Sequence, residues 1–435
     1  MIVAPLVLIL LTIPGAGALP EVALLVKKLG ADRYAEREHA ADAIEALGPD
    51  ALPALRLARA AHDAEVRSRV EVLLDKIEQA MLTRPTLVTI RPNGQPLARI
   101  VEEIAENHDF RLQLHAKDNQ AATMERGDPD ANSRLSFWSA IDRLGLSARW
   151  QGGASPDPFG ASRPAVLHLY TELNDDRLVR DHGPFRVELR LVTTTDPAIL
   201  GCKLNVLAEP LRRLKTNGPL RLTKAVDNLG HSLLRTESDR AQQPKGVVLA
   251  EPTSPALPRL ALAETFDRPD PSATRLKNLR GTVAVEVSAR RLEPRIISLD
   301  PPEAAFGQSL ATDEHTFTIQ RIQTDPNQGT TTLELTIQPR TSAVNPFQAG
   351  QRGFRTDFRP FEPDQLLDQL ELVDAHDRPL HNLVNSRIRY DFRTQRLTLV
   401  FKASDEGGVP VQLWFHDVVR ATTEVAFEFK DVPLP

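Results

Sequence analysis

The second half of the chain repeats its own pattern, and this repeat constrains the fold more than any other feature. From Pro184 onward, short apolar segments alternate with turn residues, as in antiparallel sheets. Three markers occur twice in the same order, at 196–210, 226–233 and 283–287 and again at 325–339, 373–380 and 425–429. The repeat predicts two homologous antiparallel β-sandwiches in tandem, over residues 176–298 and 299–435. It also predicts that Asp227 is equivalent to Asp374, and Glu286 to Glu428.

Residues 19–82 have a helical pattern instead. Asp32 and Asp63 are expected to cap helices, and Gly48 suits the position after a helix end. Residues 31–80 resemble a HEAT-type repeat and the start of the next. The features that carry the resemblance are Arg37 and Glu38, Gly48, the run Ala51-Leu52-Pro53-Ala54-Leu55, and Asp63-x-Glu65-Val66-Arg67. One repeat and a half implies a small helical cap or docking module rather than a superhelix.

Between these parts, residues 84–171 alternate strand-like and helix-like segments. Strands are expected at 86–90, 110–115, 146–150 and 165–170, and amphipathic helices at 96–108 and 137–144. The region resembles the short N-terminal domain of secretins and TonB-dependent receptors. The residues that carry the resemblance are Pro96-Leu97-x-x-Ile100-Val101-x-x-Ile104-Ala105, Leu135-x-Phe137-Trp138-x-Ala140-Ile141-x-x-Leu144 and Gly145-Leu146. The resemblance implies contact with a protein partner at the cell envelope. The expected fold class is therefore multi-domain α+β.

The first eighteen residues indicate export. Residues 2–13 are almost wholly apolar, Pro14 and Gly15 interrupt any helix, and Ala16-Gly17-Ala18 has the small residues that signal peptidase requires. A membrane span needs about 20 residues, so this segment is short for one. We expect a signal peptide over residues 1–18 and a periplasmic or envelope location, with membrane contact only where the signal remains uncleaved. A buried first helix is the alternative, which Pro5 and Pro14 disfavour.

Composition excludes several classes. The formal charge of the 435 residues is −5 and no polybasic run occurs, so nucleic acid is not an expected partner. The single cysteine, Cys202, lies in a strand-like run and is expected to pack as a small hydrophobic residue.

No catalytic sequence motif is present, so we assign no catalytic residue and expect no cofactor. Asp374, His376 and Asp377 form the densest group of metal-ligand types, but a turn formula inherited by duplication explains them as well. His416 and Asp417 are neighbours in a strand, which directs their side chains to opposite faces and disfavours a catalytic dyad.

A docking strand is the remaining candidate site. Prolines bracket the segment that contains Thr86, Val88 and Ile90, which suits a strand at the boundary of a sheet. An edge strand offers unpaired backbone groups to a partner strand. The alternative, a central strand buried on both faces, fits the apolar residues Leu87, Val88 and Ile90 equally well.

These observations favour a non-enzymatic exported envelope protein that mediates protein–protein interaction or scaffolding. The alternative is a hydrolase or a carbohydrate-binding protein that acts on envelope polysaccharide. The expected partners are envelope proteins, and the sequence assigns neither their identity nor an oligomeric state.

Overall fold

A computed structural model provides the structure of the protein. The residues that it describes are 18–90, 95–108, 110–115, 134–153, 163–171, 177–194, 199–234, 258–267, 272–311, 315–325, 327–339, 369–376, 378, 382–391, 394–402 and 409–435. They form a mixed α+β structure with several sheets, which confirms the α+β part of the expectation. The expected signal segment lies outside the described residues, apart from Ala18. Among the described helices, none combines the length and the apolar character needed to cross a membrane.

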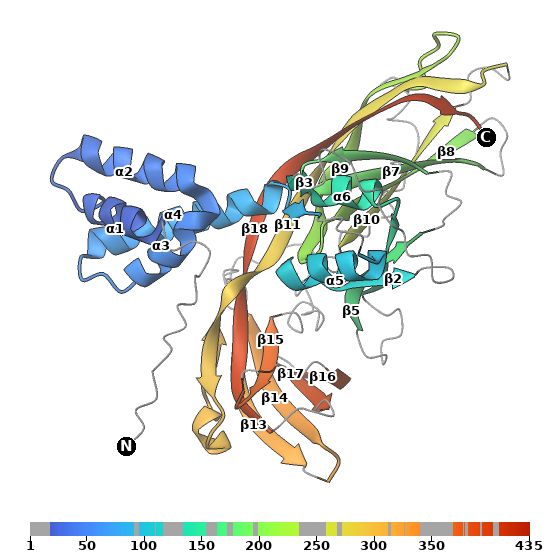
Figure 1. Ribbon diagram of the computed structural model, residues 1–435. Coiled ribbons are helices and arrows are strands. Elements are labelled where there is room, and N and C mark those ends of the chain that lie inside the picture. Colours follow the sequence, from blue (N-terminus) through green and yellow to red (C-terminus); the bar gives the residue numbers. More distant parts are fainter. Residues whose placement is uncertain are drawn as a thin grey trace, which may run out of the picture. The chain divides into compact units, whose positions relative to one another are not determined.

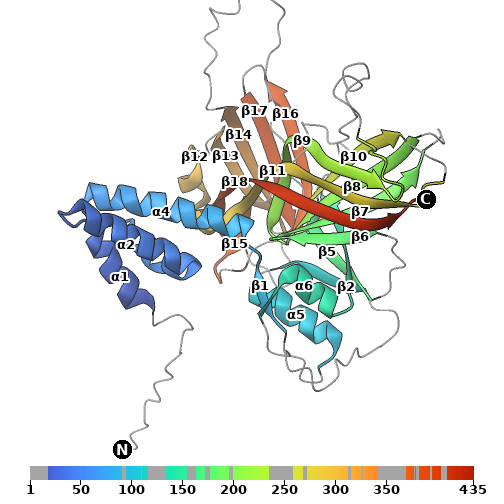
Figure 2. The same ribbon diagram turned by 90° about the horizontal axis from the view of Figure 1, so that it is seen from above.

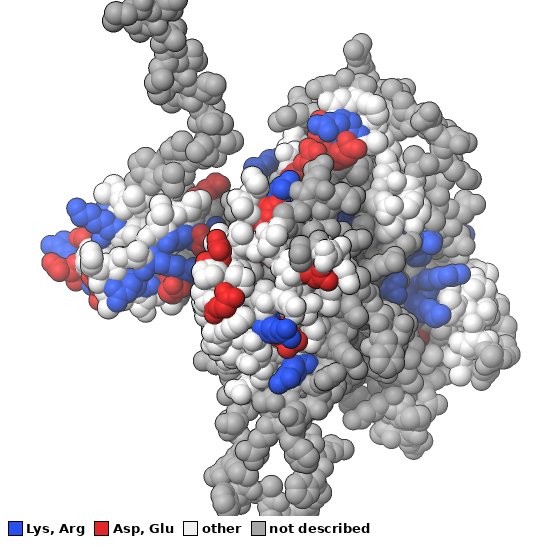
Figure 3. Space-filling view, turned by 90° about the horizontal axis from the view of Figure 1, so that it is seen from below, with Lys and Arg blue, Asp and Glu red and all other residues white. Residues whose placement is uncertain are grey.

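The chain divides into two compact units, residues 1–84 and 85–435. The first contains α1 (Ala18–Lys28), α2 (Tyr34–Leu47), the 3-10 turn η1 (Gly48–Ala51), α3 (Leu52–Ala58) and α4 (Ala64–Thr83). Their apolar faces share one core. Basic and acidic side chains lie intermingled on the surface of this unit (Figure 3), where ion pairs such as Arg56–Glu78 and Arg69–Glu38 join neighbouring helices.

Two of the three predicted helix signals are confirmed. The Asp63 carboxylate accepts hydrogen bonds from the amides of Glu65 and Val66 at the start of α4, and Gly48 has a φ of +58° after α2. The predicted cap at Asp32 is wrong, because Arg33 occupies the cap position and its side chain makes no capping bond. The Arg37 guanidinium instead holds this turn, since it donates to the carbonyl oxygens of Ala31 and Asp32 at 2.9 and 3.0 Å.

The second unit begins with a small α/β part. It consists of β1 (Leu87–Thr89), α5 (Leu97–His108), β2 (Leu112–His115), β3 (Arg134–Ser136), α6 (Phe137–Arg143), β4 (Ser147–Gly153) and β5 (Arg163–Tyr170). Strand β1 pairs with β3, and a second sheet has the order β2-β5-β4. Helices α5 and α6 lie beside these strands (Figure 2) and share a core with Leu167 and Leu169 of β5.

The rest of the unit is β-structure. Its strands are β6 (Leu178–His182), β7 (Phe185–Thr193), β8 (Ile199–Ala208), β9 (Arg212–Asp227), β10 (Arg259–Asp267), β11 (Arg275–Ser298), β12 (Ser309–Ala311), β13 (His315–Asp325), β14 (Thr330–Pro339), β15 (Leu370–Asp374), β16 (Asn382–Asp391), β17 (Thr394–Lys402) and β18 (Pro410–Pro433), with the 3-10 turn η2 (Pro302–Ala305) before β12. They form three sheets with the orders β10-β8-β7-β6, β15-β18-β11-β9 and β12-β13-β14-β17-β16.

The sheet β15-β18-β11-β9 crosses the predicted boundary at residues 298 and 299. Its long strands β11 and β18 run side by side in antiparallel orientation (Figure 1). One end of β18 places Leu413 and Phe415 in a core with the five-stranded sheet. Near its other end, the Phe429 ring lies 5.9 Å from the Arg180 guanidinium of β6. The two β-rich halves are therefore interlocked through shared long strands.

The two halves have corresponding strand orders. In the first half β10, β8, β7 and β6 are neighbours in that order, and in the second half β17, β14, β13 and β12 are. Asp227 pairs with Leu276 at the start of β11, and Asp374 pairs with Pro410 at the start of β18. Both ladders then skip one residue of the long strand, Lys277 in one and Val411 in the other.

This correspondence supports only part of the predicted equivalence. Asp227 and Asp374 occupy matching positions, and so do their ladder partners Leu276 and Pro410. Counting the same number of residues onward from these two partners makes Glu286 of β11 correspond to Arg420 of β18. The predicted match of Glu286 with Glu428 is therefore wrong in register, although both residues lie on corresponding strands. The short Val-Ala-x-Glu pattern fits an alternating strand in more than one register, whereas the turn at each aspartate fixes its position.

The two aspartates make the same contacts. Asp227 accepts bonds from the amides of Leu229 and His231, and Asp374 from those of His376 and Arg378, all at 2.8 to 3.0 Å. Both carboxylates are buried. Each turn therefore depends on one buried carboxylate that satisfies two backbone donors.

We expect Asp227→Ala and Asp374→Ala each to lower the free energy of unfolding by about 2 kcal/mol, because each removes a buried carboxylate that accepts two backbone amides of its turn. Urea titration followed by circular dichroism measures the loss. Asp325→Ala is the control, since Asp325 accepts the Asn327 amide in the same way but in an accessible turn. Equal losses in all three variants would contradict the role assigned to the buried turns.

Candidate functional site

The predicted docking strand lies at the edge of a sheet. β1 pairs only with β3, and no other described strand lies along its second edge. Val88 is fully buried and Ile90 is buried, whereas Leu87 is 42% exposed and Thr89 is exposed. One face of the strand thus packs on the core and the other is accessible.

The ladder shows which backbone groups face outward. The Phe137 amide donates to the Thr86 carbonyl at 2.9 Å, so Thr86 belongs to a hydrogen-bonded pair. Bonded and non-bonded pairs alternate along an antiparallel ladder. Val88 is therefore the next bonded residue, and Leu87 and Thr89 direct their N–H and C=O groups away from β3.

Glu209 holds the beginning of this strand. Its carboxylate accepts the Thr86 amide at 2.9 and 3.2 Å and pairs with the Arg212 guanidinium, which also donates to the Thr86 hydroxyl at 3.4 Å. The Glu209 side chain is fully buried. Burial raises the pKa of Glu209, against the opposing effects of Arg212 and Thr86. Loss of either charge would leave the other buried without its partner, which is costly.

A strained turn presents the two charged side chains. The Arg212 amide donates to the Glu209 carbonyl at 3.3 Å across a turn whose central residues are Pro210 and Leu211. Leu211 has a φ of +69°, in a position where glycine is preferred. A leucine in this conformation needs support from its surroundings. The Glu209–Arg212 pair supplies such support, and so the turn and the anchor of β1 stabilise each other.

Three further side chains attach α6 and β4 to the same end of the β7–β8 hairpin. Trp138 Nε1 donates to the Pro184 carbonyl at 3.0 Å, and Trp150 Nε1 to the Ala208 carbonyl at 3.2 Å. Arg186 is buried against the Trp138 ring, with its guanidinium 4.8 Å from the ring centre. These contacts make the small α/β part and the hairpin one packed structure.

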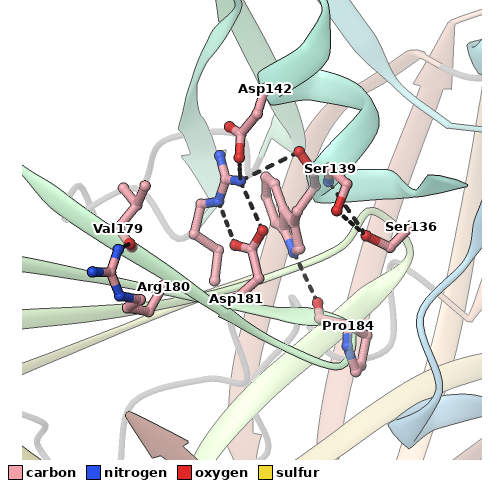
Figure 4. A network of polar contacts seen from close by, with 9 residues as sticks. Ser136, Ser139, Asp142, Val179, Arg180, Asp181 and Pro184 are labelled. Atoms are coloured by element: carbon pink, nitrogen blue, oxygen red, sulfur yellow. Dashed lines mark hydrogen bonds and ion pairs between the residues drawn. The ribbon is translucent and has the colours of Figure 1, made fainter. Parts of the chain in front are cut away.

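The Arg186 guanidinium also joins two acidic side chains. Asp142 of α6 and Asp181 of β6 approach it from different elements (Figure 4), with closest distances of 2.6 and 2.8 Å. The sequence did not point to Arg186, because Asp142, one of its two acidic partners, is 44 positions away. The pattern of β7 hides it, since Arg186 and Glu188 stand at the charged positions of an ordinary alternating strand, where solvent-facing side chains are expected, and yet both are buried in the structure.

The structure does not bring the candidate metal ligands Asp374 and His376 together around a common site. The Asp374 carboxylate accepts two backbone amides and pairs with Arg378, His376 is exposed, and Asp377 lies outside the described residues. Within the described ranges, no cluster of three or more His, Cys, Asp or Glu side chains is arranged to hold a metal ion.

His416 and Asp417 have separate partners. Asp417 pairs with Arg295 at 2.5 Å, whereas buried His416 donates to the Arg291 carbonyl at 2.8 Å and lies 3.5 Å from the Glu371 carboxylate. Burial by itself would raise the pKa of Glu371, but the hydrogen bond to His416 and the charge of Arg290 outweigh it and lower the pKa to about 2. Glu371 is thus a structural anion at the bulge of β11.

A second accessible group was not expected from the sequence. His115 of β2 and His168 of β5 face each other on one side of the sheet β2-β5-β4, with Nε2 and Nδ1 2.6 Å apart. The Tyr170 ring stacks on His115 at 4.7 Å.

The cysteine has no accessible thiol. Cys202 is buried in β8, and burial raises the pKa of its thiol to about 12, which makes it a poor nucleophile.

Comparison with known proteins gives little. No protein-family model and no curated protein matches the chain. Among solved structures, "The crystal structure of the conserved domain protein from Bacillus anthracis" matches with a TM-score of 0.15 and 10% identity, over 60% of this chain and 90% of that one. A similarity of this size carries no argument about fold or function.

The lowered pKa of Glu371 gives a pH dependence with a defined sign. A carboxyl whose folded pKa lies below its unfolded value contributes stability above about pH 4.5 and loses it as the pH falls towards about 2. We expect this contribution to reach about 2 to 3 kcal/mol. Urea unfolding between pH 6 and pH 2.5 should show a steeper loss in the wild type than in Glu371→Gln. Glu424→Gln, which removes an exposed carboxylate from β18, should keep the wild-type slope, and identical slopes in all three proteins would refute the assignment.

Proposed function

We propose that this chain is an exported, non-enzymatic protein of the cell envelope that binds a protein partner by strand addition at β1. The expectation of export rests on the apolar segment at residues 1–18. The observation that carries the binding proposal is that β1 is a sheet edge and that the buried Glu209 holds Thr86, the residue directly before it. A fixed edge loses less conformational entropy when a partner strand pairs with it.

The chemistry of the described carboxylates favours binding over hydrolysis. The buried carboxylates of Glu209, Asp227 and Asp374 bind an arginine or backbone amides, and the more exposed Asp142 and Asp181 bind the buried Arg186. These carboxylates therefore have partners within the protein and are not directed at a substrate. The alternative hydrolase needs two carboxyl groups directed at a substrate.

The contacts of the tryptophans disfavour the other alternative, a carbohydrate-binding protein. Trp138, Trp150 and Trp414 each donate their indole N–H to a group of the protein itself, namely Pro184, Ala208 and Gln412. Trp138 is also fully buried. These rings serve packing, whereas a carbohydrate-binding face presents them to the ligand.

We further propose that residues 31–80 are related to HEAT-type repeats. The support is a contact that recurs at an interval of thirty residues. Arg37 binds the carbonyls of Ala31 and Asp32, and Arg67 binds those of Ala61 and His62. Each arginine lies in the first turns of a helix and fastens the loop before it.

Two other relationships belong to the same proposal. The element order from β1 to β5, with two helices between strands, supports a kinship of residues 84–171 with the short N-terminal domain of secretins and TonB-dependent receptors. The matching strand orders, turns and bulges of residues 176–298 and 299–435 support an internal duplication of a β-sandwich. The duplicated halves would then share the long strands β11 and β18.

Thr89→Pro tests the binding edge. It removes an outward N–H and places a ring on the open side of β1, and the ladder to β3 keeps its bonds. We expect partner capture from envelope extract to fall at least tenfold while the melting temperature stays within a few degrees. A photo-crosslinking residue at Leu87 should form an adduct with the same partner, and one at exposed Glu102 of α5 should not.

Val88→Pro is the matched variant, because Val88 is buried and bonded to β3, and it should unfold the small α/β part. If Thr89→Pro captures the partner as well as the wild type does, strand addition at β1 is excluded.

A further inference from the structure

The two imidazoles on the sheet β2-β5-β4 converge more closely than packing requires. His115 Nε2 and His168 Nδ1 are 2.6 Å apart, and the two rings are nearly parallel, with centres 4.9 Å apart. Both rings are only partly buried. Two neutral imidazoles in this arrangement share a single proton between the facing nitrogen atoms.

The backbone fixes this convergence. β2 and β5 are parallel neighbours, with His115 paired to Tyr170 and Gln113 paired to His168. On the opposite face of the sheet, Leu167 and Leu169 are fully buried in the core under α5 and α6. The two histidines therefore stand on a rigid support, and Tyr170 restrains the His115 ring by stacking on it.

We propose that His115 and His168 together bind one divalent transition-metal ion. Metal–imidazole bonds measure about 2.0 to 2.1 Å, so two nitrogens on one ion lie about 3 Å apart. The observed separation needs to open by about half an ångström, which side-chain rotation of partly exposed rings provides. The shared proton moves to a nitrogen that faces away, so that both Nε2 of His115 and Nδ1 of His168 present lone pairs to the ion.

The donor set selects the class of ion. Two imidazoles suit Cu²⁺, Ni²⁺ and Zn²⁺, whereas Ca²⁺ and Mg²⁺ require several oxygen ligands. Water would fill the remaining positions, so the site is open, and among these ions Cu²⁺ should bind most tightly.

Cu²⁺ added to the purified, chelator-treated full-length protein tests the proposal. Electron paramagnetic resonance at one equivalent should show two imidazole nitrogens in the equatorial plane, and calorimetry should give one site that precedes any weaker binding. His115→Gln and His168→Gln should each weaken this site at least tenfold. His182→Gln, which removes an exposed histidine elsewhere in the same unit, should leave the affinity unchanged.

The nitrogen count comes from the wild type, so it decides the question even where a variant fails to fold. A spectrum with one nitrogen or none overturns the proposal. So does equal affinity in the wild type and in folded His115→Gln and His168→Gln.

Discussion

The buried contact of Glu209 with Thr86 and Arg212 is the interaction on which the second unit of the chain depends. It joins residues 123 positions apart and connects the first strand of the small α/β part to the turn between β8 and β9. A fully buried carboxylate is tolerated only because an arginine and a backbone amide compensate it. Trp138, Trp150 and Arg186 fasten the same end of the hairpin, so the small part and the β-sheets pack as one body.

The two β-rich halves share the long strands β11 and β18. Strands β11 and β18 pair along most of their length and belong to one sheet. This shared sheet covers the core of the five-stranded sheet, so the two halves do not have separate pairs of sheets. The two halves differ at the position of Glu209. The apolar segment of β8 is followed by the buried Glu209, whereas the matching segment of β14 is followed by the exposed Gln338. The charged anchor that holds β1 is thus present in the first half, and the second half has a glutamine at the matching position of its sequence.

Local signals in the sequence predicted local structure well. The cap at Asp63, the turn at Gly48 and the aspartate turns at 227 and 374 all depend on bonds within a few residues, which sequence patterns reveal. The signals failed where a distant partner decides the outcome. Arg37 displaced Asp32 as the determinant of its turn, the register of β11 against β18 followed the turns rather than the strand pattern, and the pairs Thr86–Glu209 and His115–His168 join strands that only the folded chain brings together.

Hydrogen exchange of the β1 amides tests the central claim, that Glu209 holds this edge strand in place. Glu209→Gln removes the charge that pairs with Arg212, and Glu188→Gln is the matched control, since Glu188 is another buried, arginine-paired residue of the same β-sheets that does not touch β1. The account predicts that exchange at Thr86 and Val88 accelerates at least tenfold in Glu209→Gln and stays at the wild-type rate in Glu188→Gln. Unchanged protection of β1 in Glu209→Gln would contradict it.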